Sequence, residues 1–527
     1  MVVIASACST TTATPPDPTN VTEGSVVPRN EPVRGGTLSV AIAAGDIQLS
    51  PTARRWNGSE LQIGRAIYDR LMVRSTSDQP AVELLTKISA SANNTLWTLK
   101  IRPDVEFHDG TPLTAQSVVA NLEAQRRSVV GESLLRSVAS VTATDELTVQ
   151  VSLLSPWSTF PEVLTTQIGF IASPTTLMGG PAIGTGAFRA NGFDLSGSLS
   201  AVRNENYWKT GLPYLDGVRF VAIEDPALRL TAVEDGSADF TVVNDPGQLR
   251  RMDELAKNSK YAVHEDRNEE RPKLFAALNT GRPPFDRISA RRAVAYATNR
   301  EQLLNEGIYG EGRIARGIVS DTSPWFTDAG GYAFDVQKAT EEARNYEDET
   351  GTPLQFILLV PPDPTQARIA SLWRVQLAAA GITIVLASPS DGEIGILQLT
   401  GQYQAVLQVG FQSPTPDLYE PNLVGSLNEK PAVSPNVTRY VNTLVNRAYA
   451  EARATNDLLR QGDSWRIVQE QIAVDHPYVV MLQLREAAFS SARVRDVTAW
   501  KSGEGSDALG QEQATVSLAQ IWLAAAK

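Results

Sequence analysis

The stretch from Trp97 to Asn121, WTLKIRPDVEFHDGTPLTAQSVVAN, constrains the fold more than any other part of the chain. Its first residues alternate between apolar and polar side chains, which is the period-2 pattern of a half-buried strand. The letters HDGTP that follow are typical of a tight turn. Thr114 is the predicted N-cap of the next helix, with Ser117 three residues later where a full capping box has Glu or Gln. The stretch therefore predicts a strand, a tight turn and a helix in succession.

This stretch resembles the signature segment of the family 5 solute-binding proteins, the peptide- and nickel-binding lipoproteins that serve ABC importers. In that family the segment reads aromatic-T-hydrophobic-K-hydrophobic-R, then F-H-D-G-T-P-hydrophobic-T-A. Further motifs of the family follow in its order: GTGAF from Gly184, NENYW from Asn204 and PYLDGV from Pro213. The resemblance extends from about Gly35 to about Val497.

The resemblance implies an α/β fold of the periplasmic-binding-protein type (cluster C), with two α/β lobes, a hinged cleft and an extra small domain. The chain would cross between the lobes near Pro272–Leu274 and near Leu484–Ala487. The predicted segments are a lipobox and flexible tether over 1–34, a first lobe over 35–73, 180–272 and 486–527, a small domain over 74–179, and a second lobe over 273–485.

Element patterns outside the signature segment agree with an α/β chain. Leu354–Val360 is a nearly continuous apolar run, typical of a buried parallel strand. A helix from Asp363-Pro364 to Ala380 and a strand over Ile382–Leu386 follow, so we expect a right-handed βαβ unit. The tail, Ser517–Ala526, is predicted to be a terminal helix packed on the first lobe.

The bulk properties of the 527-residue chain exclude several classes of function. A net charge of −12 disfavours nucleic acid and anionic membrane surfaces as partners. The single cysteine permits no internal disulfide, and the three histidines are too far apart in sequence for a local metal cluster. His108 stands alone in its Gly-Pro turn, without a second ligand at metal spacing. We therefore assign no metal, cofactor or catalytic residue.

The one cysteine, Cys8, follows Ser6-Ala7 in a pattern that resembles a bacterial lipobox. The apolar run before it, Met1–Ile4, is shorter than the ~7–15 residues of a secretory h-region, so a buried or free thiol is the alternative. A Thr/Pro-rich tether follows, which favours lipidation of Cys8. No apolar run reaches the ~18 residues that cross a bilayer. We expect an extracytoplasmic protein anchored to the outer face of the cell membrane by that lipid alone.

Two loops supply the candidate ligand-binding residues. In the first, Arg side chains can bind a carboxylate and a Trp can form an apolar wall, although a solvated basic loop is the alternative. The resemblance places an acid that binds a peptide α-amino group in the second loop, but Pro414 occupies that position, so the anchor is either absent or supplied by Asp417 or Glu420. The candidates are Arg54, Arg55, Trp56, Asn57, Phe411, Gln412, Ser413, Asp417, Tyr419 and Glu420.

The predicted function is capture of short peptides in the cleft, by a monomer, and their delivery to the permease subunits of an ABC importer. The loop that replaces the amino anchor leaves a non-peptide solute open, such as a sugar, an opine-like conjugate or a metal chelate. A lipoprotein that kept the fold and lost transport is a further alternative. A hydrolase is disfavoured, because no Gly-x-Ser-x-Gly elbow occurs in the sequence.

Overall fold

The computed structural model describes residues 31–266, 270–330, 333–425 and 434–525. Cys8 and residues 1–30 of the predicted tether lie outside the described residues. Residues Val33–Lys527 form one compact unit. Among the helices described, none is long and apolar enough to cross a membrane.

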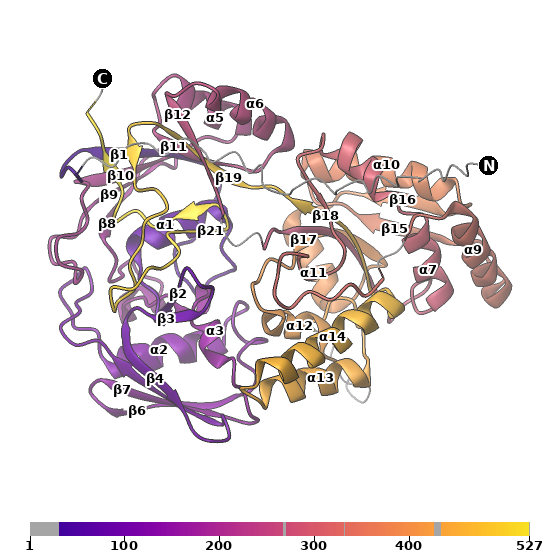
Figure 1. The fold of residues 1–527 in the computed structure, drawn as a ribbon, viewed down its shortest axis with the longest axis horizontal. Helices are drawn as coiled ribbons and strands as arrows, with labels where there is room; N and C mark the ends of the chain where they lie inside the picture. Colours follow the sequence, from indigo (N-terminus) through magenta and orange to yellow (C-terminus); the bar gives the residue numbers. More distant parts are fainter. Residues whose placement is uncertain (1–30, 267–269, 331–332, 426–433, 526–527) are drawn as a thin grey trace, which may run out of the picture. The chain divides into compact units, whose positions relative to one another are not determined.

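A seven-stranded mixed sheet forms the first part of the fold, in the order β12-β19-β11-β1-β10-β9-β8 (Figure 1). The central strand β1 runs parallel to β10 and β11, and the other pairs are antiparallel. The strands are β1 (Thr37–Ile42), β8 (Phe188–Phe193), β9 (Leu199–Arg203), β10 (Gly217–Ala222), β11 (Phe240–Val243), β12 (Tyr261–Glu265) and β19 (Ala487–Ser491).

Both faces of this sheet are covered, as the alternation along β1 requires. Leu38 and Val40 enter one apolar core together with α1 (Gly58–Ile67), while Ala41 enters a second core with α5 (Pro226–Glu234) and α6 (Pro246–Ala256). Successive side chains of a strand point to opposite faces, so one short strand contributes to two cores. The sequence TLSVAI after Gly35-Gly36 predicts a strand over Thr37–Ile42, and Asp225-Pro226 predicts a helix that begins at Pro226 and ends at Glu234; β1 and α5 have these bounds.

The signature stretch forms part of a four-stranded antiparallel sheet, β4-β5-β7-β6, with α2 (Ala115–Arg126) packed on one face. The Thr114 N-cap is confirmed, and Ser117 completes the capping box because its side chain accepts from the Thr114 N–H. The neighbouring elements are β2 (Met72–Arg74), β3 (Pro80–Val82), β4 (Leu85–Ala90), β5 (Leu96–Ile101), β6 (Val138–Asp145), β7 (Thr148–Leu153), α3 (Phe160–Val163), η1 (Gln167–Gly169) and α4 (Pro174–Leu177).

A six-stranded sheet, β14-β18-β13-β17-β15-β16, forms the other half of the fold (Figure 1). The predicted βαβ unit is confirmed: β15 and β16 pair in parallel and α10 connects them. The strands are β13 (Lys273–Leu278), β14 (Gly312–Ile314), β15 (Gln355–Leu359), β16 (Thr383–Ala387), β17 (Ala405–Gly410) and β18 (Tyr478–Leu484).

Helices cover both faces of this second sheet. Leu274 of β13 enters a core with α7, α9 and α10, and Phe275 enters the opposite core with α13 and α14. The helices are α7 (Ile288–Tyr296), α8 (Arg300–Gln302), η2 (Leu303–Gly307), α9 (Val336–Thr350), α10 (Pro364–Ala378), α11 (Asp391–Thr400), η3 (Pro416–Tyr419), α12 (Glu420–Leu423), α13 (Thr443–Arg453) and α14 (Leu458–Asp475).

The chain passes between the two large sheets where the sequence predicted. Strand β12 belongs to the seven-stranded sheet and β13 to the six-stranded sheet, and β18 and β19 repeat the crossing in reverse. Only Arg485 and Glu486 separate β18 from β19. We call the seven-stranded sheet with its helices the first lobe and the six-stranded sheet with its helices the second lobe. The segment boundaries proposed from the sequence stay predictions.

The predicted C-terminal helix over 517–526 is wrong for the residues that the structure describes there. The tail instead contains β21 (Gln511–Glu512), β22 (Thr515–Val516) and β23 (Trp522–Leu523), and β23 pairs with β20 (Val494–Arg495). Leu518, Ile521 and Trp522 are all buried. Packing of these side chains into the first-lobe core overrides the helix propensity of the alanine-rich end.

Candidate functional site

A cavity of about 390 Å³ is lined by residues of both lobes. One side comes from the loop before α1, from α1 itself and from the region of β2, and the other from the loop that follows β17. The volume lies in the range of ~300–1,000 Å³ that small-molecule sites occupy. The cavity is therefore the candidate ligand site.

Six of the ten predicted ligand-binding residues line this cavity and four do not. The structure brings together Arg55 and Trp56 from the first loop with Phe411, Gln412, Ser413 and Tyr419 from the second. Arg54, Asn57, Asp417 and Glu420 do not belong to the lining. Each of these four has protein partners instead.

Asn57 and Arg54 hold the start of α1. The Asn57 side chain accepts from the Glu60 N–H at 2.9 Å, and the Glu60 carboxylate accepts from the Asn57 N–H at 3.0 Å, which makes a capping box. Arg54 pairs with the same Glu60 at 2.6 Å. Gln167 fastens the loop further by accepting from the Trp56 N–H at 2.9 Å. These contacts fix the backbone from which Arg55 and Trp56 project.

Asp417 is fully buried in contacts that join the two sides of the cavity. It accepts hydrogen bonds from the Trp157 indole N–H at 2.7 Å and the Thr159 hydroxyl at 2.8 Å, and it pairs with Arg453 at 2.5 Å. The Arg453 guanidinium lies 4.2 Å over the Trp157 ring. We call Asp417, Trp157, Thr159 and Arg453 the Asp417 network. Because its hydrogen-bonding capacity is used here, Asp417 is not presented to a solute.

Glu420 also forms a contact across the cavity. Its carboxylate pairs with Arg136, which precedes β6, and lies 3.9 Å from Arg453. Neither acid of the second loop lines the cavity, so neither is presented to a ligand ammonium group.

Sequence reasoning missed a row of arginines on the first-lobe side. Arg65 and Arg70 both pair with Glu512, at 3.0 and 2.5 Å, and all three residues line the cavity. Burial lowers the pKa of Arg65 to about 10, although Glu512 opposes the shift. No motif in the sequence indicates this cluster, because Glu512 lies far along the chain and only the fold brings it to the arginines.

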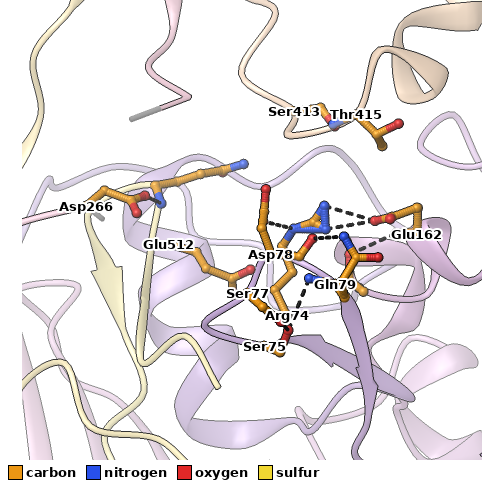
Figure 2. A network of polar contacts seen from close by, with 12 residues as sticks. Arg74, Ser75, Ser77, Asp78, Gln79, Glu162, Asp266, Ser413, Thr415 and Glu512 are labelled. Atoms are coloured by element: carbon orange, nitrogen blue, oxygen red, sulfur yellow. Dashed lines mark hydrogen bonds and ion pairs between the residues drawn. The ribbon is translucent and has the colours of Figure 1, made fainter. Parts of the chain in front are cut away.

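Arg74 extends the row, and Figure 2 shows its guanidinium held between carboxylates. It pairs with Glu162 at 2.7 Å and with Asp78 at 3.2 Å. Burial raises the pKa of Glu162 to about 7, with Arg74 acting against that shift. Ser413 of the second-lobe loop lies across from this group in Figure 2, without a marked contact to it. The paired arginines form a polar wall whose charges are already largely compensated.

Arg55 differs from the other arginines of the wall because it has no hydrogen-bond or ion-pair partner among the described residues. Its side chain is exposed to water, and the protein that surrounds it in the cavity lowers its pKa by partial desolvation. Next to it, the indole N–H of Trp56 is buried and also lacks a partner within the described chain. A guanidinium and an indole N–H are donors suited to a carboxylate.

The second-lobe side of the cavity is an apolar wall on a locked loop. The Phe411 ring meets Tyr419 and Tyr478 edge to face at 5.0 and 5.1 Å. Tyr419 both donates to the Ser413 carbonyl at 2.8 Å and accepts from the Ser413 N–H at 3.0 Å. Lys273 donates to the Phe411 carbonyl at 2.8 Å. A rigid aromatic face opposite unpaired donors can select a solute that is part apolar and part anionic.

The His108 turn of the signature segment contacts the GTG motif and not the cavity. The His108 ring accepts from the Gly184 N–H at 3.3 Å through Nδ1 and donates to the Gly186 carbonyl at 2.9 Å through Nε2. Burial lowers the pKa of His108. Within the described part of the chain, no group of three or more His, Cys, Asp or Glu side chains is placed to hold a metal ion.

Comparison with known proteins agrees with this architecture. A model of the bacterial extracellular solute-binding proteins, family 5, matches residues 79–430. The glutathione-binding protein GsiB of Pectobacterium atrosepticum is 24% identical over 427 residues, which cover 77% of this chain and 80% of that protein.

Two solved structures show the same fold at low identity. The periplasmic binding protein AgaA of A. tumefaciens R10, in complex with agropinic acid, aligns with a TM-score of 0.81 at 20% identity, over 93% of this chain and 99% of that one. The oligopeptide-binding protein AppA of Bacillus subtilis, in complex with a nonapeptide, aligns with a TM-score of 0.77 at 19% identity, over 94% and 100%. The chain belongs to family 5 of the bacterial extracellular solute-binding proteins.

Proposed function

We propose that this protein captures a short peptide, or a peptide-like amino-acid conjugate, by its carboxylate and delivers it to the permease of an ABC importer. The observation that carries the proposal is the unpaired Arg55 guanidinium in the interlobe cavity. Because no protein carboxylate in the described chain pairs with this guanidinium, a solute carboxylate can bind it without first breaking an ion pair. The names of the relatives agree with this class, since glutathione, agropinic acid and a nonapeptide all carry carboxylates.

The same proposal includes lipidation of Cys8 and anchoring at the outer face of the membrane. The support is the lipobox-like sequence ahead of the Thr/Pro-rich segment. The mass of the N-terminal peptide, isolated from membranes, tests it: an unmodified Cys8 contradicts the anchor and leaves the binding proposal standing.

Titration calorimetry tests the binding proposal with alanyl-alanine, trialanine, S-methylglutathione and the C-terminal amide of each. We expect the wild-type protein to prefer the free acids, and Arg55→Gln to weaken binding of the acids by about tenfold or more, because a hydrogen bond to a charged group is worth ~1.5–3 kcal/mol. The amides should bind both proteins alike.

Arg447→Gln is the matched control, since Arg447 is exposed on α13 and pairs with Glu451 at 3.4 Å. Its affinities should equal those of the wild type. If no acid binds the wild-type protein, or if Arg55→Gln keeps the preference for acids over amides, the proposal is wrong.

A further inference from the structure

A second, much smaller cavity adjoins the ligand site at the crossing between the lobes. Its volume is about 20 Å³, and it shares the lining residues Gln412 and Gln513 with the large cavity. A space of this size accommodates a single water molecule, whose requirement is ~10–15 Å³ or more. An ammonium group is similar in size to water, so the end of a solute in the large cavity can reach into this space with an amino group.

The lining of the small cavity is predominantly acidic. Glu265, Asp266, Glu270 and Glu486 contribute carboxylates, against the single cation Arg271. Glu270 is compensated by Lys273, and Glu265 pairs with Arg485 at 2.6 Å and with Arg271 at 3.5 Å. Asp266 accepts from the Gln513 N–H at 3.0 Å.

Glu486 is the exception in this lining. In the part of the chain that the structure describes, its carboxyl has no hydrogen-bond or ion-pair partner. Burial, and then the charge of Asp266, raise its pKa to about 7. A half-buried carboxyl that pairs with no cation loses hydration without gaining a partner, which is unfavourable unless something binds it. Position supports a role in binding as well, because Glu486 lies between β18 and β19, where the lobes hinge.

We propose that Glu486 accepts the ammonium group of the bound solute. The inference rests on the proposed function and names its ligand class: a solute with a free amino group at the hinge end and a carboxylate at Arg55. Glu486 would thereby supply the acidic anchor for an ammonium group that the second loop lacks. Pro414 carries no charge, and Asp417 and Glu420 are engaged with Arg453 and Arg136.

The opposite charges of the two ends then set the orientation of the solute. Arg55 lies in the loop before α1 and Glu486 at the β18–β19 crossing, on separate parts of the lining. Because a carboxylate near Glu486 and an ammonium group near Arg55 would both be repelled, the reversed solute is disfavoured.

The test compares alanyl-alanine, trialanine and S-methylglutathione with their N-acetylated counterparts by titration calorimetry. We expect the wild-type protein to bind the free amines about tenfold or more tightly than the acetylated probes, as for other hydrogen bonds between charged groups. Glu486→Gln should lose this preference and keep its affinity for the acetylated probes. Glu254→Gln, an exposed acid of α6 that pairs with Lys257 at 2.7 Å, is the matched control and should keep the preference.

A second readout separates binding from a structural role. Glu486→Gln should leave the melting temperature of the ligand-free protein unchanged or raise it, because the variant removes an unpaired carboxyl. A lower melting temperature, or a preference for free amines that survives in Glu486→Gln, overturns the inference while carboxylate binding at Arg55 stands. If the wild-type protein binds none of the probes, the proposed function fails first, and the inference fails with it.

Discussion

At the scale of single residues, buried polar groups of the first lobe explain why separate sequence motifs occur together. Asp69, after α1, accepts hydrogen bonds from Thr185 at 3.0 Å, from the Tyr207 hydroxyl at 3.0 Å and from the Trp208 indole at 2.8 Å. One buried carboxylate therefore joins the end of α1 to the GTG and NENYW motifs. Unpaired, it would be costly, so each motif depends on the others.

The GTG motif likewise serves packing, because its glycines lie directly against the end of α1. A Cβ atom on Gly184 would lie 2.2 Å from the Ile67 carbonyl oxygen, and one on Gly186 would lie 2.5 Å from the Ile67 carbonyl carbon. Only glycine allows this strand entry to approach the end of α1 so closely. These motifs thus identify the fold without touching the ligand site.

His264 gives a prediction at the same scale. Burial lowers its pKa to about 4, and its Nε2 lies 3.0 Å from the Ser490 hydroxyl. The unfolded chain, with a His pKa of about 6.5, binds the proton more readily, so the folded state loses stability as pH falls from about 6.5 towards 4. By pH 5 the loss approaches ~2 kcal/mol, since one pKa unit corresponds to ~1.4 kcal/mol.

Urea unfolding of wild type and His264→Gln between pH 7.5 and pH 5 measures this effect. The glutamine variant should be less stable or equal at pH 7.5 and should gain on the wild type as the solution becomes acidic. A difference between the two proteins that does not change with pH contradicts the assignment.

At the scale of elements, local sequence signals predict several internal strands and helices correctly but fail at the C-terminal tail. The alternation over Thr148–Leu153 predicts a strand with the bounds that β7 has, and the start signal Asp225-Pro226 correctly predicts where α5 begins. The apolar spacing from Leu61 to Leu71 predicts a helix over those residues, whereas α1 begins three residues earlier and spans Gly58–Ile67. The helix predicted for the C-terminal tail is wrong, because local propensity does not show that the tail packs against strands distant in sequence.

The candidate site was predictable to a similar degree. Arg55, Trp56 and Phe411 lie in loops after strands, the usual place for ligand contacts in such folds, and all three line one cavity. The arginine wall and Glu512, by contrast, meet only through tertiary structure. Asp417 looked like a ligand anchor because sequence shows the charge and not its partners.

The start of α1 carries the prediction for an element. Asn57→Ala should lower the free energy of unfolding by about 1 kcal/mol, because the Glu60 N–H loses its cap. Asn57→Ser, which can still cap, should remain within a few tenths of the wild-type value. Urea denaturation of the ligand-free proteins measures both changes. Equal stability of the alanine variant, together with weaker solute binding, would instead give Asn57 a direct role in binding.

At the scale of the whole molecule, the Asp417 network contributes to the free energy that holds the two sides of the cavity together. Trp157 and Thr159 precede α3, whereas Asp417 and Arg453 belong to the second lobe. The Ser158 N–H also donates to the Arg453 carbonyl at 2.7 Å. These bonds can form only when the two sides are together, so they stabilise the closed arrangement over an open one.

Removing one of these bonds should therefore shift the protein from the closed arrangement towards the open one. Trp157→Phe retains an aromatic ring, although a smaller one, and removes the indole N–H that binds Asp417, which weakens closure by ~1.5–3 kcal/mol for a hydrogen bond to a charged group. The ligand-free variant should show a larger radius of gyration in X-ray scattering, and saturating solute should restore the wild-type value. Affinity should fall, because the apparent Kd rises as the fraction of closed protein decreases.

Two further variants separate closure from general destabilisation. Arg136→Gln removes another contact across the cavity, to Glu420, from a partly exposed side chain, and should act in the same direction. Trp373→Phe removes an indole bond of 2.9 Å to Thr298 inside the second lobe, so it should lower stability without changing the radius of gyration or the affinity. If Trp157→Phe and Trp373→Phe behave alike, the Asp417 network only holds the fold together, and closure on the solute must depend on contacts made by the solute itself.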